Sequence, residues 1–354
     1  MHRQTDLFIS GTDGYHTFRI PSVVVTPKGT VLAFCEGRKE STHDSGDIAL
    51  LLKRSQDGGA TWSNLQIVWD DPGHTCGNPC AVVDRESGAI CLLTSHNLGT
   101  DVESQIIDET SQGSRTIWLS RSTDEGLTWS ASSDITATTK KSNWTWYATG
   151  PGAGIQQASG RLIIPCDHIE SRTKKYYSHI IYSDDGGLTW ELGGSTPSDQ
   201  VNECEVAELE DGRLLLNMRN YDPAQRNRAR SYSADGGLTW SALEQDEALI
   251  EPICQATLRR FTTTADGGRS RLLFANPASQ QARENMTVRL SYDEGLTWPV
   301  TRVLHPGPAA YSCLAVLQDQ TLVCLYERGD ENAREKITWA HFDLEWLTEG
   351  NDQL

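Results

Sequence analysis

One eight-residue pattern, S-x-D-x-G-x-T-W, limits the possible folds of this chain more than any other feature of the sequence. Its copies begin 50 to 67 residues apart, and a repeat of this size is typical of a solenoid, a propeller or another array of structural units. The five copies are SQDGGATW at 55–62, STDEGLTW at 122–129, SDDGGLTW at 183–190, SADGGLTW at 233–240 and SYDEGLTW at 291–298.

The physical chemistry of this octet predicts a corner between two strands. Asp accepts hydrogen bonds from backbone N–H groups and Gly tolerates a positive φ, so together they favour a tight turn. Thr and Trp then start a strand, in which the Trp side chain buries a large apolar surface. Each copy also follows a short apolar run, such as IALLLKRS at 48–55. We therefore interpret the octets as folding corners rather than as ligand sites.

Hairpin-like pairs of strands with polar turns form a second repeat between the octets. Five of these hairpins are followed by an octet, and the sixth by ITWAHFDLEWL, which we expect to form plain strands. No segment of useful length has the periodicity of a helix. Six units of four antiparallel strands predict an all-β fold, a six-bladed β-propeller, as a single domain over residues 1–354. The six hairpins span 22–35, 79–94, 153–166, 204–218, 254–275 and 312–326.

The charge balance excludes two classes of partner. The formal net charge is −17, and binding to nucleic acid or to an anionic membrane needs clustered Lys and Arg. A few local arginines are still compatible with a small anionic ligand. No run of 18 or more apolar residues is present, so we expect no membrane span.

The cysteines and the N-terminus bear on compartment. The nine cysteines are an odd number, several lie in apolar strand-like runs, and buried reduced thiols of an intracellular protein are the simplest interpretation. CGNPC at 76–80 lacks a second pair at zinc spacing, so we expect no metal site. MHRQTDLFIS at 1–10 has no apolar core of a signal peptide. A cytoplasmic location is favoured over a secreted protein whose signal has been removed, and the oligomeric state stays open.

The topology of a blade places several polar residues on one rim. If the strands are named a to d, the a–b turn and the octet share one face. The start of a, the end of b and the start of c then share the other face, around the central hole. Arg289 lies two residues before an octet and falls toward the octet face, so Arg283 is the better candidate for an arginine on the opposite rim. Seven side chains fall on the rim away from the octets: Arg19, Arg38, Asp44, Glu203, Arg219, Arg283 and Tyr311.

Several motifs in this order resemble the exo-sialidase (neuraminidase) family of bacterial and animal type. The resemblance covers nearly the whole chain and includes the five octets, which correspond to the Asp-boxes of that family. The other motifs that carry it are FRIP at 18–21, NECEVAEL at 202–209, NMR at 217–219, RENMTVRLSYDEGLTW at 283–298 and AYS at 310–312.

The resemblance implies a carboxylate-binding triad and a nucleophile. Arg19, Arg219 and Arg283 occupy the positions of the three arginines that hold the sialic acid carboxylate, as guanidinium groups do in charge-assisted pairs. Tyr311 matches the nucleophile and Glu203 its partner. A neutral phenol avoids repulsion with the substrate carboxylate, and sialidases use a Tyr nucleophile where most glycosidases use a carboxylate. The phenol pKa of about 10 requires a base within hydrogen-bond reach.

The resemblance also implies an acid/base carboxyl group. Asp44 matches it, and Asp47 is the alternative because the loop after EGR aligns less tightly. This group protonates the leaving oxygen and then activates water. We expect Arg38 to contact the carboxylate or a neighbouring hydroxyl.

Other residues on the same rim have two interpretations. Asp167 and His168 follow the third hairpin, and either contact the glycerol or N-acyl arms or form a polar loop end. Trp144, Trp146 and Tyr147 either line a sugar pocket or pack the loop that leads into the third blade.

The expected function is retaining hydrolysis of terminal α-linked sialic acids from glycans or oligosaccharides, with no metal or organic cofactor. The alternatives are hydrolysis of a related nonulosonic acid such as KDN, transfer instead of hydrolysis, and an inactive glycan-binding propeller. The linkage preference and the preferred N-acyl group stay open.

Overall fold

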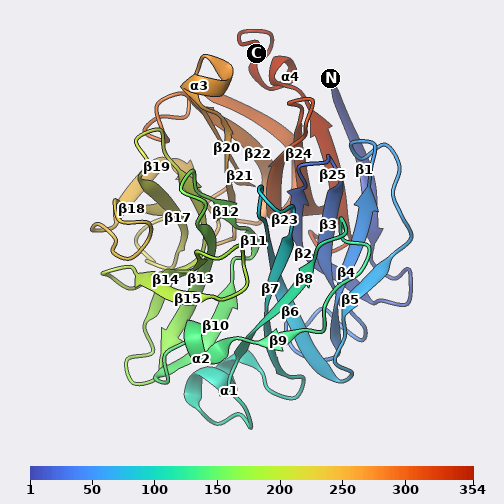
Figure 1. Ribbon diagram of the computed structural model, residues 1–354, viewed down its shortest axis with the longest axis vertical. Helices are drawn as coiled ribbons and strands as arrows, with labels where there is room; N and C mark the ends of the chain where they lie inside the picture. The colour runs from blue at the N-terminus through green and yellow to red at the C-terminus, as the bar shows by residue number, and fades with distance from the viewer.

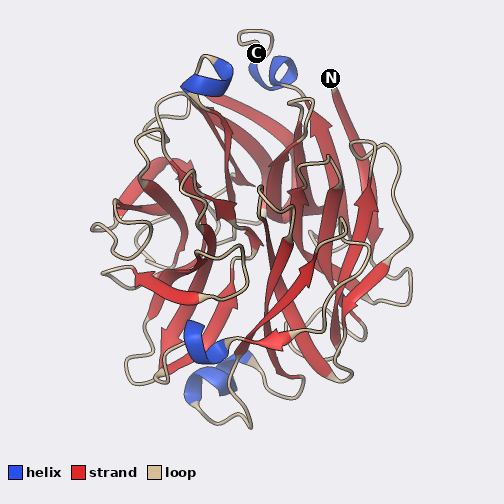
Figure 2. Cartoon of the chain, in the orientation of Figure 1, coloured by secondary structure: helices blue, strands red, loops and turns tan.

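The structure is a computed structural model that describes residues 1–354, with Gly267 described only as the last residue of a helix. Its strands are arranged around a centre, and the chain ends lie near each other at one edge (Figure 1). Strands dominate the described chain and the helices are short (Figure 2). Among the described residues, no helix has the length and apolar character needed to cross a membrane.

The first three blades follow the chain order. In blade 3 the inner strand is divided, because β10 (Trp144–Thr149) and β12 both pair with β13, while β11 (Gly152–Ala153) pairs with β6 of blade 2. Blade 1 contains β2 (Thr17–Val25), β3 (Val31–Arg38), β4 (Ile48–Ser55) and β5 (Gln66–Trp69). Blade 2 contains β6 (His74–Val83), β7 (Ile90–Leu98), β8 (Thr116–Ser122) and β9 (Ser133–Asp134). Blade 3 contains β12 (Ile155–Gln156), β13 (Leu162–Glu170), β14 (Tyr176–Ser183) and β15 (Glu191–Ser195).

Blade 4 is a sheet of its own, whereas blades 5 and 6 are continuous at β23, whose two halves belong to these two blades. The short helices lie outside the blades: α1 (Glu103–Asp108), α2 (Thr136–Thr139), α3 (Thr264–Gly267) and α4 (Leu344–Thr348). Blade 4 contains β16 (Val201–Glu208), β17 (Leu214–Asn220), β18 (Asn227–Ser233) and β19 (Glu244–Ile250), and blades 5 and 6 contain β20 (Thr257–Thr262), β21 (Arg271–Pro277), β22 (Glu284–Ser291), β23 (Val300–Val316), β24 (Leu322–Arg328) and β25 (Lys336–Phe342).

The sequence prediction was wrong about the end of blade 6. The segment ITWAHFDLEWL forms β25 and then the helix α4, rather than two strands. Asp343 caps this helix, since its side chain accepts a hydrogen bond from the N–H of Trp346 at 2.8 Å. The outer strand of blade 6 is instead β1 (His2–Ile9), which pairs antiparallel with β25 and closes the ring.

The octets form the predicted strand corners, and each corner satisfies its own polar groups. In the fourth copy, Asp235 accepts hydrogen bonds from the N–H of Thr239 at 2.9 Å and from its hydroxyl at 2.6 Å. The Ser233 hydroxyl donates to Asp235 at 2.8 Å and accepts from the N–H of Gly237 at 2.8 Å. Gly237 has a φ of +89°, and a Cβ there would lie 2.5 Å from Ile180, so glycine is required.

The octet tryptophans connect neighbouring blades. Trp240 is 8% exposed and belongs to a buried cluster with Ile163 and Ile180 of blade 3. Its indole N–H donates to the carbonyl of Gly194 at the end of that blade, at 2.9 Å. The octets therefore stabilise the ring by packing one blade on the previous one, on the face opposite to the residues considered next.

Candidate active site

Four inner strands are irregular at the same level near one rim of the central hole. Asn78, Glu203 and Tyr311 fall inside these irregular segments in blades 2, 4 and 6, and Arg19 borders the one in blade 1. A β-bulge interrupts the alternation of a strand and turns a side chain toward a new direction. The register shifts lie between Arg19 and Ser22, Gly77 and Cys80, Val201 and Cys204, and Ala309 and Ser312.

Arg19 is held by a carboxylate from the opposite end of the chain. Its Nε and Nη2 donate to the two oxygens of Glu327 at 3.0 and 3.1 Å, and its Nη1 donates to Asp44 at 3.2 Å. Glu327 is fully buried and also accepts the N–H groups of Ile20 at 2.8 Å and Tyr311 at 3.2 Å. Only one nitrogen of this guanidinium group therefore faces the rim.

Tyr311 and Glu203 form a short hydrogen bond at the centre of the site. The phenol donates to Oε1 of Glu203 at 2.5 Å, and both residues are 6% exposed. Nη1 of Arg219 donates to Oε2 of Glu203 at 2.6 Å and to the Tyr311 oxygen at 3.2 Å. Burial and then the charge of Glu203 raise the pKa of Tyr311, although the nearby arginines oppose this shift. The phenol is therefore protonated at neutral pH.

Two further guanidinium groups lie against the ring of Tyr311. The Cζ atoms of Arg19 and Arg283 are 4.9 and 5.7 Å from the ring centroid. Nη2 of Arg283 donates to the carbonyl of Ile253 at 3.2 Å. Three positive charges from blades 1, 4 and 5 therefore converge beside one phenol, an arrangement whose chemistry suits a carboxylate.

Asp44 and Asp47 have different partners. Asp44 is paired with Arg38 at 2.7 Å as well as with Arg19, and its side chain is 60% exposed. Burial alone would raise the pKa of Asp44, but the charges of Arg38 and Arg19 lower it to about 2. Asp47 pairs with Lys39 at 2.8 Å, away from these arginines. Arg38 is itself held by Glu36, whose Oε2 lies 2.7 Å from its Nη2.

The structure separates the two predicted residues of blade 3. Asp167 is fully buried, accepts a hydrogen bond from Asn202 at 3.2 Å, and lies near Glu203, whose charge adds to burial in raising the pKa of Asp167. His168 stacks on Trp144, with ring centroids 3.4 Å apart, and its pKa falls to about 3 because of burial. His168 therefore packs inside the blade.

A cavity of about 410 Å³ adjoins Asp44. Its walls come from the loop that carries Asp44, from the N-terminal part of α1 and from blade 3. Trp146 and Tyr176 supply its aromatic surfaces, and Glu103 supplies a second carboxylate. Trp146 is thus the member of the aromatic segment 144–147 that lines this cavity, while Trp144 packs on His168 and Tyr147 is fully buried.

Comparison with known proteins finds relatives that match nearly the whole chain. Residues 29–324 match the family model described as a BNR repeat-like domain. The chain is 32% identical to an exo-alpha-sialidase of Aspergillus fumigatus, over 95% of this chain and 86% of that one. The chain belongs to the sialidase family.

Other members of the sialidase family differ from this chain in length. A sialidase of Micromonospora viridifaciens is 35% identical over 98% of this chain, but the chain spans only 54% of that protein's length. The solved structure of the Hadza microbial sialidase Hz136 superposes with a TM-score of 0.88 at 29% identity, covering 97% of this chain and 69% of that one. These likenesses establish the six-bladed β-propeller.

Glu327 was missed by the sequence reasoning. It lies at the end of β24, the second strand of blade 6, as Arg38 and Arg219 lie at the ends of the second strands of their blades, and that position was the available signal. Arg115 was also missed, although it immediately precedes β8, the third strand of blade 2, on the same rim.

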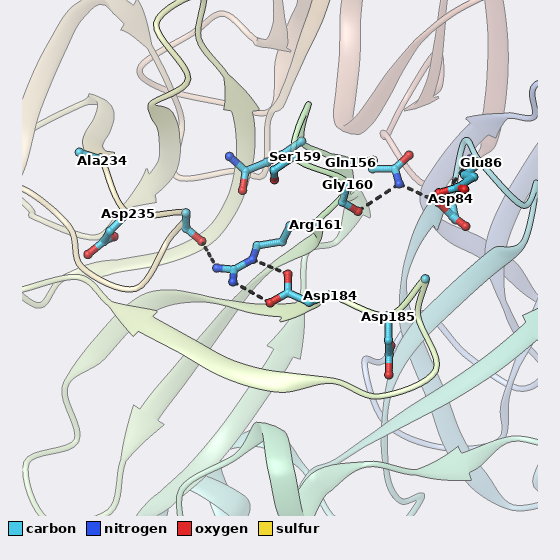
Figure 3. Close-up of a pocket in the computed structure, with 13 residues that line it drawn as sticks. Asp84, Glu86, Gln156, Ser159, Gly160, Arg161, Asp184, Asp185, Ala234 and Asp235 are labelled. Carbon is cyan, nitrogen blue, oxygen red and sulfur yellow. Dashed lines mark hydrogen bonds and ion pairs between the residues drawn. The ribbon is translucent and has the colours of Figure 1, made fainter.

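A larger cavity on the octet face has a different character. It measures about 790 Å³ and lies between the octet corners of blades 3 and 4 and the neighbouring turns (Figure 3). Arg161 forms a bidentate pair with Asp184 at 2.8 and 2.7 Å, and also donates to the carbonyl of Gly236. Asp185 and Asp235 also line this cavity, and their carboxylates accept hydrogen bonds from backbone N–H groups of their own turns. Among the described residues, no cluster of three His, Cys, Asp or Glu side chains could hold a metal ion.

Proposed function

We propose that this protein is an exo-α-sialidase that hydrolyses terminal α-linked sialic acids from glycans with retention of configuration. The observation that carries the proposal is the 2.5 Å hydrogen bond between Tyr311 and Glu203, surrounded by three guanidinium groups. A protein that only binds glycans needs the arginines but has no use for a phenol coupled to a base.

Substrate binding begins with the carboxylate on the anomeric carbon. Arg19, Arg219 and Arg283 bind this carboxylate and thereby place the anomeric carbon over the Tyr311 oxygen. Binding also changes Asp44, because Nη1 of Arg19 then shares its charge with the substrate carboxylate. The pKa of Asp44 rises from about 2 as this stabilisation is lost, which allows Asp44 to act as a proton donor.

The first chemical step forms a covalent intermediate. The Tyr311 oxygen attacks the anomeric carbon and its proton passes to Glu203, while protonated Asp44 donates its proton to the glycosidic oxygen. The bond to that oxygen breaks, and the alcohol leaves through an oxocarbenium-like transition state.

The second step reverses these roles. Asp44 takes a proton from water, the water oxygen attacks the anomeric carbon, and the bond to Tyr311 breaks. Glu203 then returns its proton to the phenolate. Two displacements at one carbon give net retention.

The test uses the release of 4-methylumbelliferone from its α-sialoside by the full chain between pH 4 and 8. We expect turnover, and proton NMR of an early time point should show the α-anomer of free sialic acid as the first product. Absence of turnover by pure, folded protein would overturn the proposal for this sugar. A β-anomer formed first would overturn the double-displacement mechanism.

A further inference from the structure

Tyr311 and Glu203 belong to different blades, with blade 5 between them. Glu203 lies on β16 of blade 4, and Tyr311 lies on the second half of β23, in blade 6. Backbone ladders join the strands of a blade, and no ladder among the described residues joins β16, β20 and the second half of β23 to one another. Side chains must therefore determine how far apart the two residues lie.

Glu205 connects the inner strands of blades 4 and 5. It lies on β16, two residues after Glu203, and its side chain is buried. Its Oε2 accepts the N–H of Leu258 at 2.7 Å and the hydroxyl of Thr257 at 3.0 Å. Its Oε1 accepts the N–H of Ala153, which belongs to β11, at 3.3 Å. One carboxylate therefore holds three inner segments together.

Thr257 continues this connection to the strand that carries the candidate nucleophile. Its side-chain oxygen accepts the N–H of Leu314 at 3.0 Å, while its hydroxyl donates to Glu205. Leu314 lies three residues after Tyr311 on β23. Two hydrogen bonds, with a few residues of strand on either side, thus connect Glu203 with Tyr311.

Gln255 makes a second connection, directly beside Tyr311. Its Oε1 accepts the N–H of Ser312 and its Nε2 donates to the carbonyl of the same residue, both at 2.9 Å. Its Nε2 also donates to the carbonyl of Pro151 at 3.0 Å. Gln255 precedes β20 of blade 5, so this blade holds the backbone of β23 at two levels, at Ser312 and at Leu314.

We propose that Glu205 is a positioning residue for the first chemical step. Together with Thr257 it fixes the separation of blades 4 and 6 at which the phenol of Tyr311 reaches Glu203. The transfer of a proton from a nucleophile to its base depends on this separation, and a displacement of about 1 Å can lower a rate roughly 100-fold. This inference rests on the proposed function, because it assigns Glu205 to the reaction of Tyr311.

Two of the carboxylate-binding arginines are held independently of this connection. Arg19 is fixed by Glu327, and Arg283 donates to the carbonyl of Ile253. Substrate binding should therefore persist when the connection is broken, whereas the geometry of the attack should not. Loss of Glu205 is expected to lower kcat and to leave KM nearly unchanged, which a general loss of folded structure would not do.

The experiment measures kcat and KM for a 4-methylumbelliferyl α-sialoside with wild-type protein, Glu205→Leu and Thr257→Val. Leu accepts no hydrogen bond, so Glu205→Leu should lower kcat about 10- to 100-fold and keep KM within about twofold. Val has nearly the shape of Thr, so Thr257→Val should fold and lower kcat about three- to tenfold, the effect of one neutral hydrogen bond. Because both variants break one connection, the double variant should be hardly slower than Glu205→Leu.

Glu205→Gln is the conservative variant, because its amide oxygen can still accept from Leu258 and Thr257. It should restore most of the kcat that Glu205→Leu loses.

Asp246→Asn is the matched control, because Asp246 is also a buried carboxylate that joins blade 4 to blade 5. It lies on the outer strand β19, and its Oδ2 accepts the indole N–H of Trp298, in an octet, at 3.2 Å. This variant should lower the melting temperature and leave kcat unchanged.

An unchanged kcat in the folded Glu205→Leu and Thr257→Val variants would overturn the inference. An equal loss of kcat in Asp246→Asn, or a higher KM at unchanged kcat, would overturn it as well. If the wild type shows no turnover, the proposed function fails. Crystal structures of wild type and Thr257→Val then still test the connection, because the distance of 2.5 Å between Tyr311 and Glu203 should increase in the variant. An unchanged distance would show that Thr257 and Glu205 do not set it.

Discussion

Carboxyl groups on the two faces of the propeller reach the same low pKa by different means. Asp235 on the octet face and Asp44 on the active-site rim both have a pKa of about 2. Burial would raise both values. In Asp235, hydrogen bonds from Thr239 and Ser233 outweigh burial, whereas in Asp44 the charges of Arg38 and Arg19 do so.

The hydrogen-bond and ion-pair partners of Asp235 and Asp44 come from different parts of the chain, and this difference determines whether a partner can be exchanged for a ligand. The partners of Asp235 lie within four residues in its own turn, so they cannot be replaced without breaking that turn. Asp44 depends on guanidinium groups, one of them 25 residues away, and a guanidinium can exchange one carboxylate for another. Changes on the octet face should therefore affect stability, and changes on the active-site rim should affect activity.

The largest expected effect on the rim is that of Tyr311→Phe. Removal of the nucleophile should lower kcat roughly 10³-fold or more while the fold is kept, because the ring still packs between the arginines. Glu203→Gln should also be strongly impaired. Since the two residues act as a unit, the double variant should be hardly slower than Tyr311→Phe alone. Steady-state kinetics and melting temperatures provide the measurements.

Tyr147→Phe is the control for the loss of a buried hydroxyl. Tyr147 is fully buried in the apolar cluster between blades 2 and 3, away from the arginines of the rim. This variant should keep wild-type kcat. A Tyr311→Phe variant with near-wild-type rates would refute the nucleophile assignment and with it the contrast between the two faces.

Asp44→Asn should give the next largest effect. Without a proton donor, cleavage of a natural sialyl-lactose should slow about 10²- to 10⁴-fold, whereas an aryl sialoside with a good leaving group should be affected less. Asp47→Asn is the matched control, since Asp47 pairs with Lys39 rather than with Arg19 and Arg38. If Asp47→Asn shows the leaving-group dependence and Asp44→Asn does not, the acid/base roles are exchanged.

Glu327→Gln should combine a loss of activity with a loss of stability. Breaking a buried ion pair on one side costs about 3–5 kcal/mol of the free energy of unfolding. Because Arg19 also loses its orientation, KM for sialosides should rise about tenfold, the cost of weakening one hydrogen bond to a charged group. Denaturant unfolding and steady-state kinetics measure the two effects.

Asp352→Asn separates these effects. It breaks a similar bidentate pair with Arg271, at 2.7 Å for both bonds, in blade 5 away from the rim. It should lower stability and leave KM unchanged. An unchanged KM in Glu327→Gln would show that Glu327 serves stability alone.

Much of this organisation could be predicted from the sequence, because it follows from repetition. The octets and hairpins predict six blades, and blade topology then assigns Arg19, Glu203 and Tyr311 to one rim. The structure brings these residues together, with Asp44, Arg38, Arg219 and Arg283 beside them. A local sequence pattern that recurs from blade to blade can be recognised without knowing which distant residues are in contact.

The remaining features depend on contacts that no repeat encodes. The pairing of β1 with β25 and that of Glu327 with Arg19 join the two ends of the chain. His168 was expected on the rim, but β13 continues through it, and adjacent strand residues point to opposite faces. Its neighbour Asp167 therefore lies toward Asn202, while His168 packs on Trp144.

The smallest effect on activity is expected on the octet face, for Asp235→Asn. It should lower the melting temperature by a few degrees and leave kcat/KM within twofold, because the turn loses hydrogen bonds but the rim is untouched. The folded-state pKa of Asp235 lies below its ordinary value of 3.8, so ionisation stabilises the fold above about pH 4. This contribution disappears as the pH falls through 2.

The difference in melting temperature between wild type and Asp235→Asn should therefore be constant from pH 7 to 5 and shrink between pH 4 and 2. Glu247→Gln is the control, since Glu247 is an exposed carboxylate on the outer strand of the same blade. A difference that persists at pH 2 would mean that Asn removes packing rather than ionic hydrogen bonds. A loss of activity greater than the loss of folded protein would mean that the octet face also controls the geometry of the rim. The two faces would then not differ in whether they affect stability or activity.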